Sequence, residues 1–107
     1  MRAFELSQQG IFMSDNEIAY HVIIEGRVTG VAFRWSALDY ARDLSSLRGY
    51  IRNASYDKVE AVIQGSETHV ELMLNWLRHG PSHARVDDIK INRLPVSENL
   101  GTFTIKT

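Results

Sequence analysis

Apolar residues repeat along this chain with two different periods, and the order of those periods leaves few folds open. Over residues 18–25 the large apolar residues Tyr20, Val22 and Ile24 alternate with Ala19, His21, Ile23 and Glu25, which is typical of a strand with one well-buried face. After Arg34 they recur at helical spacing, and they do so again between Ser66, a good N-cap, and the Gly80-Pro81 stop. The two helical stripes are formed by Ala37, Leu38, Ala41 and Leu44, and by Val70, Met73, Leu74 and Leu77.

Shorter alternating stretches complete the pattern. They lie at residues 49–53 and 58–64, joined by a hairpin at 54–57, and around Ile89–Ile91 and Phe103–Ile105, where a short last strand is added. The βαββαβ order predicts an α+β, ferredoxin-like split-βαβ fold, a two-layer sandwich with an antiparallel sheet and two helices on one face. In this arrangement we expect the strand that ends at Asn53 to lie beside the strand that leads into Gly26.

Length and charge restrict the class of protein. The 107 residues suit one domain, and residues 1–17 lack periodicity, so we expect a flexible N-terminal extension followed by a domain over 18–107, with Met13 as an alternative start. A net charge of −1 and the lack of long basic runs argue against nucleic-acid binding. No apolar segment approaches the roughly 20 residues of a membrane span. We therefore expect a cytoplasmic monomer without nucleic-acid or membrane partners.

Metal and thiol chemistry are disfavoured by the residue types present. The chain has no cysteine, which excludes thiolate zinc sites and a cysteine nucleophile. Among its four histidines, His79 and His83 are four residues apart, but Gly80-Pro81 interrupts the helix that would align them. We expect no metal and no cofactor, and an activity that survives chelation of divalent ions.

Two glycines, Gly26 and Gly30, lie between the first predicted strand and the first predicted helix. They free the backbone so that successive amides point into one concavity, and the helix that begins near Arg34 adds the positive end of its dipole. Arg34 itself offers a planar donor for phosphate oxygens. An ordinary strand-to-helix turn also uses glycine, so on these residues alone an ordinary turn is favoured over an anion site.

Two stretches of the sequence resemble the signature blocks of a known family. The stretch Gly26-Arg27-Val28-Thr29-Gly30-Val31-Ala32-Phe33-Arg34 resembles the Gly-Arg-Val-Gln-Gly-Val-x-Phe-Arg signature of the acylphosphatases. Gly49-Tyr50-Ile51-Arg52-Asn53 is similar to their second block, Gly-Trp-Val-x-Asn. Smaller matches follow in the family's order to Phe103-x-Ile105, so the resemblance covers about residues 19–106. The family's fold is βαββαβ, the order that the periodicity gives independently.

The resemblance implies a metal-free hydrolase of acyl phosphates, which are mixed anhydrides of a carboxylic acid and phosphate. It implies that Arg34 holds the phosphate together with the backbone amides of the cradle, and that the Asn53 amide orients the attacking water. Acyl phosphates have a good leaving group, so such an enzyme needs mainly positioning and electrostatic stabilisation. The cradle residues are Arg27, Val28, Thr29, Gly30 and Val31.

The chain departs from the family pattern at four places. Thr29 replaces the usual glutamine, and Asp57 occupies a hairpin position where glycine is usual. The family's glycine at the end of the first helix is absent, with Ser45 and Ser46 in its place; if one of them takes the left-handed cap position, a glycine there should stabilise the fold. One extra residue lies between the two blocks, and a strand shifted by it would turn Asn53 to the opposite face.

Two other function classes stay open. RNA-recognition domains share the βαββαβ order, but the predicted strand over 58–63 carries no aromatic residue and one acidic residue. The second alternative is a regulatory domain of the same fold that binds an anion but has lost turnover, and the extra residue keeps this alternative open. Hydrolysis of an acyl phosphate would separate the enzyme from both.

Overall fold

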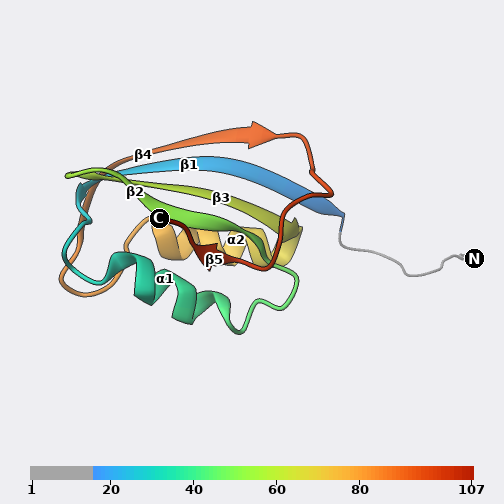
Figure 1. Cartoon of the computed structure of the whole chain (residues 1–107), viewed down its shortest axis with the longest axis horizontal. Coiled ribbons are helices and arrows are strands. Elements are labelled where there is room, and N and C mark those ends of the chain that lie inside the picture. Colours follow the sequence, from blue (N-terminus) through green and yellow to red (C-terminus); the bar gives the residue numbers. More distant parts are fainter. Residues whose placement is uncertain (1–15) are drawn as a thin grey trace, which may run out of the picture.

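The structure, a computed structural model, describes residues 16–107 (Figure 1). Its elements follow the predicted βαββαβ order with a short final strand. They are β1 (Glu17–Arg27), α1 (Phe33–Ala41), β2 (Arg48–Ser55), β3 (Lys58–Ser66), α2 (Glu67–Leu77), β4 (Arg85–Leu94) and β5 (Thr104–Ile105). The sequence predicts a flexible extension over residues 1–17. Residues 1–15 of it lie outside the described part of the chain, and Glu17 already belongs to β1.

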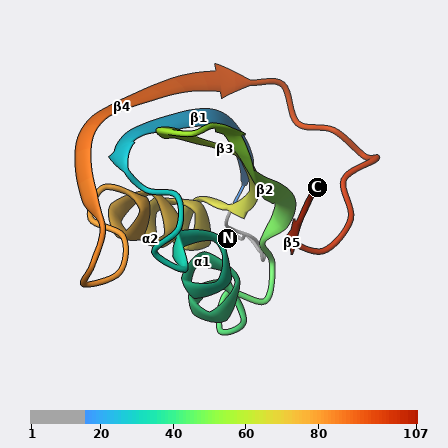
Figure 2. The same cartoon turned by 60° about the vertical axis from the view of Figure 1, so that its left-hand side comes forward.

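The five strands form one sheet in the order β4-β1-β3-β2-β5, with both helices on the same face (Figures 1 and 2). All pairings are antiparallel except that β5 runs parallel to β2. The expectation that β2 lies beside β1 is wrong. The connection through α1 leaves a strand position open, and β3 fills it by pairing with both β1 and β2, so these two strands lie about 10 Å apart.

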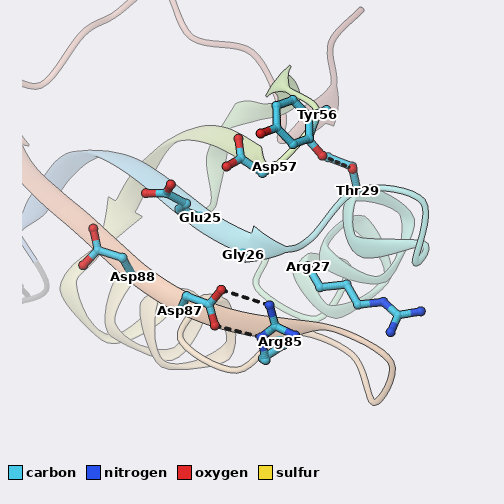
Figure 3. A pocket seen from close by; sticks show the side chains of 9 residues that line it. All are labelled: Glu25, Gly26, Arg27, Thr29, Tyr56, Asp57, Arg85, Asp87 and Asp88. Atoms are coloured by element: carbon cyan, nitrogen blue, oxygen red, sulfur yellow. Dashed lines mark hydrogen bonds and ion pairs between the residues drawn. The ribbon is translucent and has the colours of Figure 1, made fainter.

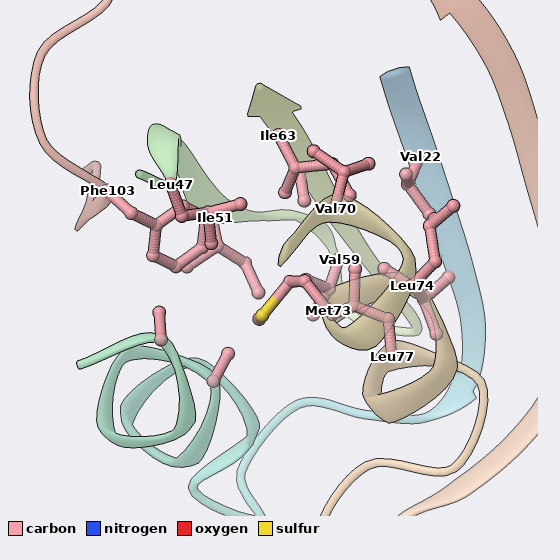
Figure 4. Packing of buried hydrophobic residues seen from close by; sticks show 14 of the residues in the cluster. Val22, Leu47, Ile51, Val59, Ile63, Val70, Met73, Leu74, Leu77 and Phe103 are labelled. Carbon is pink, nitrogen blue, oxygen red and sulfur yellow. The ribbon is translucent and has the colours of Figure 1, made fainter. Parts of the chain in front are cut away.

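The core lies between the sheet and the two helices (Figure 4). The predicted stripe of α2 is buried, and Ser66 caps this helix by accepting a hydrogen bond from the His69 N–H at 3.2 Å. Helix α1 contributes one large side chain, Phe33, and two small ones, Ala37 and Ala41. The sheet meets them with Val22, Ile24, Ile51, Val59, Ala61 and Ile63.

Helix α1 does not end in a left-handed cap. Among residues 16–107, Ala32 is the only non-glycine with positive φ, so neither Ser45 nor Ser46 takes the cap position and Asp57 is not left-handed either. The chain instead leaves the helix through successive tight turns, because Leu44 N–H donates to Ala41 O and Leu47 N–H to Leu44 O, both at 2.9 Å. The conditional gain from glycine at Ser45 or Ser46 therefore no longer applies.

The segment between β4 and β5 carries the chain from one edge of the sheet to the other. Gln64 of β3, which is fully buried, fixes this segment: its Oε1 accepts from Ser97 N–H at 2.9 Å and its Nε2 donates to Ser97 O at 2.7 Å. These two hydrogen bonds fix the middle of the segment, and beyond it β5 pairs with the free edge of β2, beside α1. Within the described part of the chain, neither helix has the length and apolar character that a membrane span requires.

Candidate active site

The predicted anion-binding loop begins where β1 leaves the sheet. The pairing of β1 with β4 is irregular between Glu25 and Gly26, and Gly26 has a φ of 142°. A side chain at this position would collide with the carbonyl oxygen of Arg85. Glycine therefore lets the two strands approach closely while the chain changes direction toward α1.

Beyond this bend the loop turns its amides toward one side. Gly30 has a φ of 70° and Ala32 a φ of 60°, while Val31 between them has a negative φ. Alternation of this kind forms a concave nest of N–H groups. Ala32 is also the N-cap of α1 and offers no side-chain acceptor to the first turn. The first amides of α1 are therefore open to an external anion, which the helix dipole also favours.

The hairpin between β2 and β3 holds the loop from outside. Gly26 N–H donates to the carbonyl of Asp57 at 2.9 Å, and the Thr29 hydroxyl donates to the carbonyl of Tyr56 (Figure 3). Thr29 stands where the family pattern has glutamine, so this departure gives the loop a tether to the hairpin. Sequence reasoning missed both anchors, because a backbone carbonyl carries no residue-type signal.

Arg34 lies in the first turn of α1 and is half-buried. Because Phe33 and Ala37 point into the core, helical geometry places Arg34 and Leu38 on one flank of the helix. That flank faces β2 and β5, since α2 lies on the other flank, where Tyr40 stacks on Trp76. Within residues 16–107, no hydrogen bond or ion pair engages the Arg34 guanidinium. Its donors are free for a ligand.

Asn53 lies on the helix-facing side of β2. It pairs with Val59 of β3, which pairs with Ile24 of β1, and paired residues of antiparallel strands point to the same face. Val59 and Ile24 are fully buried beneath the helices, whereas Asn53 is exposed. The extra residue between the two blocks has therefore not turned Asn53 away. No other described side chain or backbone group hydrogen-bonds its amide.

The remaining predicted residues lie along the loop. Val28 is 1% exposed and anchors the loop in the core, and Val31 packs against the same core. The backbone of Arg27 pairs with Arg85 of β4, and its side chain is exposed and points away from the neighbouring carboxylates (Figure 3). The structure thus gathers the cradle, Arg34 and Asn53 at one end of the sheet.

A cavity of about 610 Å³ lies on the other side of this loop and is lined by neither Arg34 nor Asn53. Four of its lining residues are acidic: Glu25, Asp57, Asp87 and Asp88. Arg85 lowers the pKa of Asp87 through a hydrogen bond of 2.8 Å, and Lys90 lowers the pKa of Asp88 through another of 2.8 Å. Arg27 and Arg85 also line the cavity, but ionised carboxylates repel phosphate and so disfavour it there.

The residues that the structure describes were compared with the side-chain groups that hold metal ions in proteins. Across residues 16–107, no three His, Asp or Glu side chains are grouped so that they could hold a metal ion. The predicted site residues offer backbone N–H groups, the Arg34 guanidinium and the Asn53 amide. Such a set suits a bound anion and an oriented water rather than a cation.

Several known proteins with similar sequences and structures are described as acylphosphatases. The acylphosphatase family model matches residues 20–105. An acylphosphatase from Roseiflexus sp. is 44% identical over 82 residues, which are 76% of this chain and 87% of the relative. The structure of an acylphosphatase from Coxiella burnetii superposes with a TM-score of 0.77 at 32% identity, over 85% of this chain and 94% of that one.

A second solved structure, an acylphosphatase from Bacillus subtilis, has a TM-score of 0.76 at 28% identity and covers 84% of this chain and 99% of its own. The agreement extends from the loop after β1 to the strand at the far edge of the sheet, because the matched range includes both sequence blocks and β5. The chain belongs to the acylphosphatase family.

Proposed function

We propose that this acylphosphatase hydrolyses acyl phosphates without a metal ion, through a phosphate held at the β1–α1 loop and a water oriented by Asn53. The phosphate oxygens accept hydrogen bonds from the amides of residues 27–31 and from the Arg34 guanidinium. The open first turn of α1 and the free donors of Arg34 support this placement. A guanidinium suits it because its planar fork meets two phosphate oxygens at once.

The reaction is an in-line displacement at phosphorus. The water oxygen forms a bond to phosphorus while the bond from phosphorus to the carboxyl oxygen breaks, and that electron pair leaves with the carboxylate. One proton of the water stays on the oxygen that is now bonded to phosphorus. The other ends on another oxygen of the released inorganic phosphate or in solvent. Asn53 accepts a hydrogen bond from the water through its amide oxygen and so fixes its direction. Because an amide is too weak a base to remove the proton, its contribution is alignment in the transition state.

One observation carries this proposal: Asn53 shares a sheet row and a sheet face with the residue that precedes the loop by two positions. Ile24, Val59 and Asn53 form that row, and Gly26 opens the loop. Asn53 and the flank of α1 that bears Arg34 therefore border the same space. A one-residue shift of β2 would have placed Arg52, not Asn53, on this face.

Substitution of Asn53 by alanine tests the assigned role. We expect kcat for acetyl or benzoyl phosphate to fall by at least about 100-fold, while inorganic phosphate inhibits at nearly the wild-type concentration. Asn92→Ala is the matched control, because Asn92 is an exposed asparagine on β4 on the open face of the sheet. It should keep wild-type kcat.

A near-normal kcat in folded Asn53→Ala would refute the role of Asn53. If the wild-type protein bound phosphate at the loop but hydrolysed no acyl phosphate, the chain would be an anion-binding domain of this fold. Circular dichroism and thermal melting of both variants confirm that any loss is not caused by unfolding.

A further inference from the structure

A groove of about 310 Å³ lies between α1 and the chain that enters β5. Its apolar lining consists of Leu38, Ala41, Leu44, Leu47 and Phe103. Three exposed polar residues, Arg42, Ser45 and Thr102, also line it. The groove is thus an apolar trough that opens to solvent, on the flank of α1 away from α2.

The groove exists because α1 is poor in bulk. This helix contributes only Ala37 and Ala41 to the core beyond Phe33, and Ala41 lines the groove together with Phe103 and Leu47. Leu38, at the flank of the helix, is half-buried and forms the groove's wall toward the helix N-terminus. Small residues at these positions therefore leave the groove unfilled from the helix side.

Both walls of the groove lead to the proposed catalytic pair. Along α1, Leu38 and Ala41 follow Arg34 by four and seven residues, so they lie on the same flank and Ala41 is about 10 Å away along the axis. Along the other wall, β5 runs parallel to β2, and Ile105 pairs with Ile51, two residues before Asn53. The groove therefore begins at Leu38, one helical turn from Arg34 on the same flank of α1.

We propose that this groove binds the acyl chain of the substrate and that the enzyme prefers acyl phosphates with a linear, apolar chain of medium length. The inference rests on the proposed placement of the phosphate at Arg34. An extended chain of about eight carbons spans the roughly 10 Å from Arg34 to Ala41, since each bond of about 1.5 Å advances the chain by about 1.3 Å. The five apolar residues of the lining favour an apolar acyl group, because a strongly hydrated group would lose water against them.

Two other hollows fit an acyl chain less well. A hollow of about 380 Å³ is lined by Trp35, Asp39, Tyr40 and Trp76, but it lies on the flank of α1 that faces α2, away from Arg34. The cavity of about 610 Å³ beside the loop is lined by four carboxylates. The first is misdirected, and the second would desolvate charges against an apolar chain.

A homologous series of substrates tests the proposal: acetyl, butyryl, hexanoyl, octanoyl and dodecanoyl phosphate. Full burial of each methylene is worth about 0.8 kcal/mol, which corresponds to about a fourfold rise in kcat/KM. Because the groove is open to solvent on one side and buries each methylene only in part, the expected rise is about twofold to fourfold per methylene. The rise should stop near eight carbons, where the groove ends. Hexanoate and octanoate added as competitors should inhibit in the same order.

Two variants test the location. Ala41→Leu fills the groove from the helix, and Thr102→Trp obstructs it from the exposed rim, where a bulky side chain does not disturb the core. Each should lower kcat/KM for octanoyl phosphate by at least about tenfold and leave that for acetyl phosphate within about twofold. Trp35→Ala, on the opposite flank and 65% exposed, is the matched control and should leave the whole series unchanged.

The outcomes separate this inference from the proposed function. A flat chain-length profile in wild-type protein that hydrolyses acetyl phosphate would overturn the groove and leave the proposed function intact. Loss of the chain-length preference in Trp35→Ala, with Ala41→Leu and Thr102→Trp unaffected, would place the acyl chain in the aromatic hollow and refute the inference. No hydrolysis of any member, acetyl phosphate included, would overturn both.

Discussion

Ser46, next to the site of the extra residue, makes an unusually dense set of contacts for a residue between a helix and a strand. Its hydroxyl lies 2.7 Å from His69 Nδ1 and 3.1 Å from Ser66 Oγ, and it accepts the Ser66 N–H at 3.0 Å. Its own N–H donates to His69 Nδ1 at 3.2 Å. These contacts tie the α1–β2 connection to the N-terminus of α2, at the opposite end of the sheet from the loop (Figure 1).

Ser46→Ala should destabilise the fold by about 2 kcal/mol. Loss of a side-chain hydrogen bond costs about 1 kcal/mol, and the Ser66 N–H, left without its acceptor, adds about 1 kcal/mol because the group is only part-buried and water reaches it. For a domain of this size about 2 kcal/mol corresponds to a fall in Tm of roughly 10 °C. The kcat of the folded variant should not change, because the contacts lie far from Arg34 and Asn53.

Thermal and urea melts of Ser46→Ala beside Ser45→Ala measure this effect. Ser45 is the neighbouring exposed serine and has no hydrogen-bond partner within the described region, so its removal should cost less than about 0.5 kcal/mol. A double-mutant cycle with His69→Ala should give a coupling free energy of about 1 kcal/mol. The Tm of Ser46→Ala is expected to fall by roughly 10 °C. If its Tm lies within about 2 °C of that of Ser45→Ala, the network does not stabilise the connection as argued.

Three further predictions concern charge and metal. Arg34→Lys should lose at least about 100-fold in kcat/KM, nearly as much as Arg34→Ala, because a point ammonium cannot make the two-pronged contact; a Lys variant with most of the activity would contradict this. Glu60 on β3 accepts hydrogen bonds from His21 at 2.7 Å and from Arg52, and chiefly the His21 bond lowers the pKa of Glu60 below 4.5. A carboxyl whose folded pKa is depressed stabilises the fold above its unfolded pKa and loses that contribution as pH falls through the folded pKa. Urea melts between pH 6 and 3 should therefore show the advantage of wild type over Glu60→Gln shrinking below pH 4.5, and a constant difference would refute it. Finally, hydrolysis of acetyl phosphate should survive exhaustive chelation, and activity that EDTA abolishes and magnesium or zinc restores would contradict metal-free catalysis.

Local sequence signals predicted the elements whose stability is local. The α2 stripe and the Ser66 cap are confirmed, because apolar residues at helical spacing and an N-cap hydroxyl act within one element. The position of β3 between β1 and β2 was missed, since strand neighbours are set by pairing between distant segments. The left-handed Ala32 was also missed, because alanine has no intrinsic preference for that conformation and the surrounding loop imposes it.

The candidate site divides in the same way. The cradle, Arg34 and Asn53 were named from two sequence blocks, whereas their common face follows only from the register of β2 against β3. The Tyr56 and Asp57 carbonyls that hold the loop gave no signal. The sequence did not indicate the apolar groove either. The groove depends on the small size of Ala41 and on the position of Phe103, which is set by the parallel pairing of β5 with β2.

The hairpin between β2 and β3 makes the register of β2 matter twice. It carries Asn53 in one arm and, at its tip, the two carbonyls that hold Gly26 and Thr29. A slip of β2 by one residue would therefore turn Asn53 away from the helices and misalign the hairpin tip with the loop. The extra residue upstream is compatible with function only if it is absorbed before β2 begins. The tight turns through Leu44 and Leu47, which bury both leucines, lie before β2, and β2 enters the sheet at Arg48 in the register that pairs Asn53 with Val59.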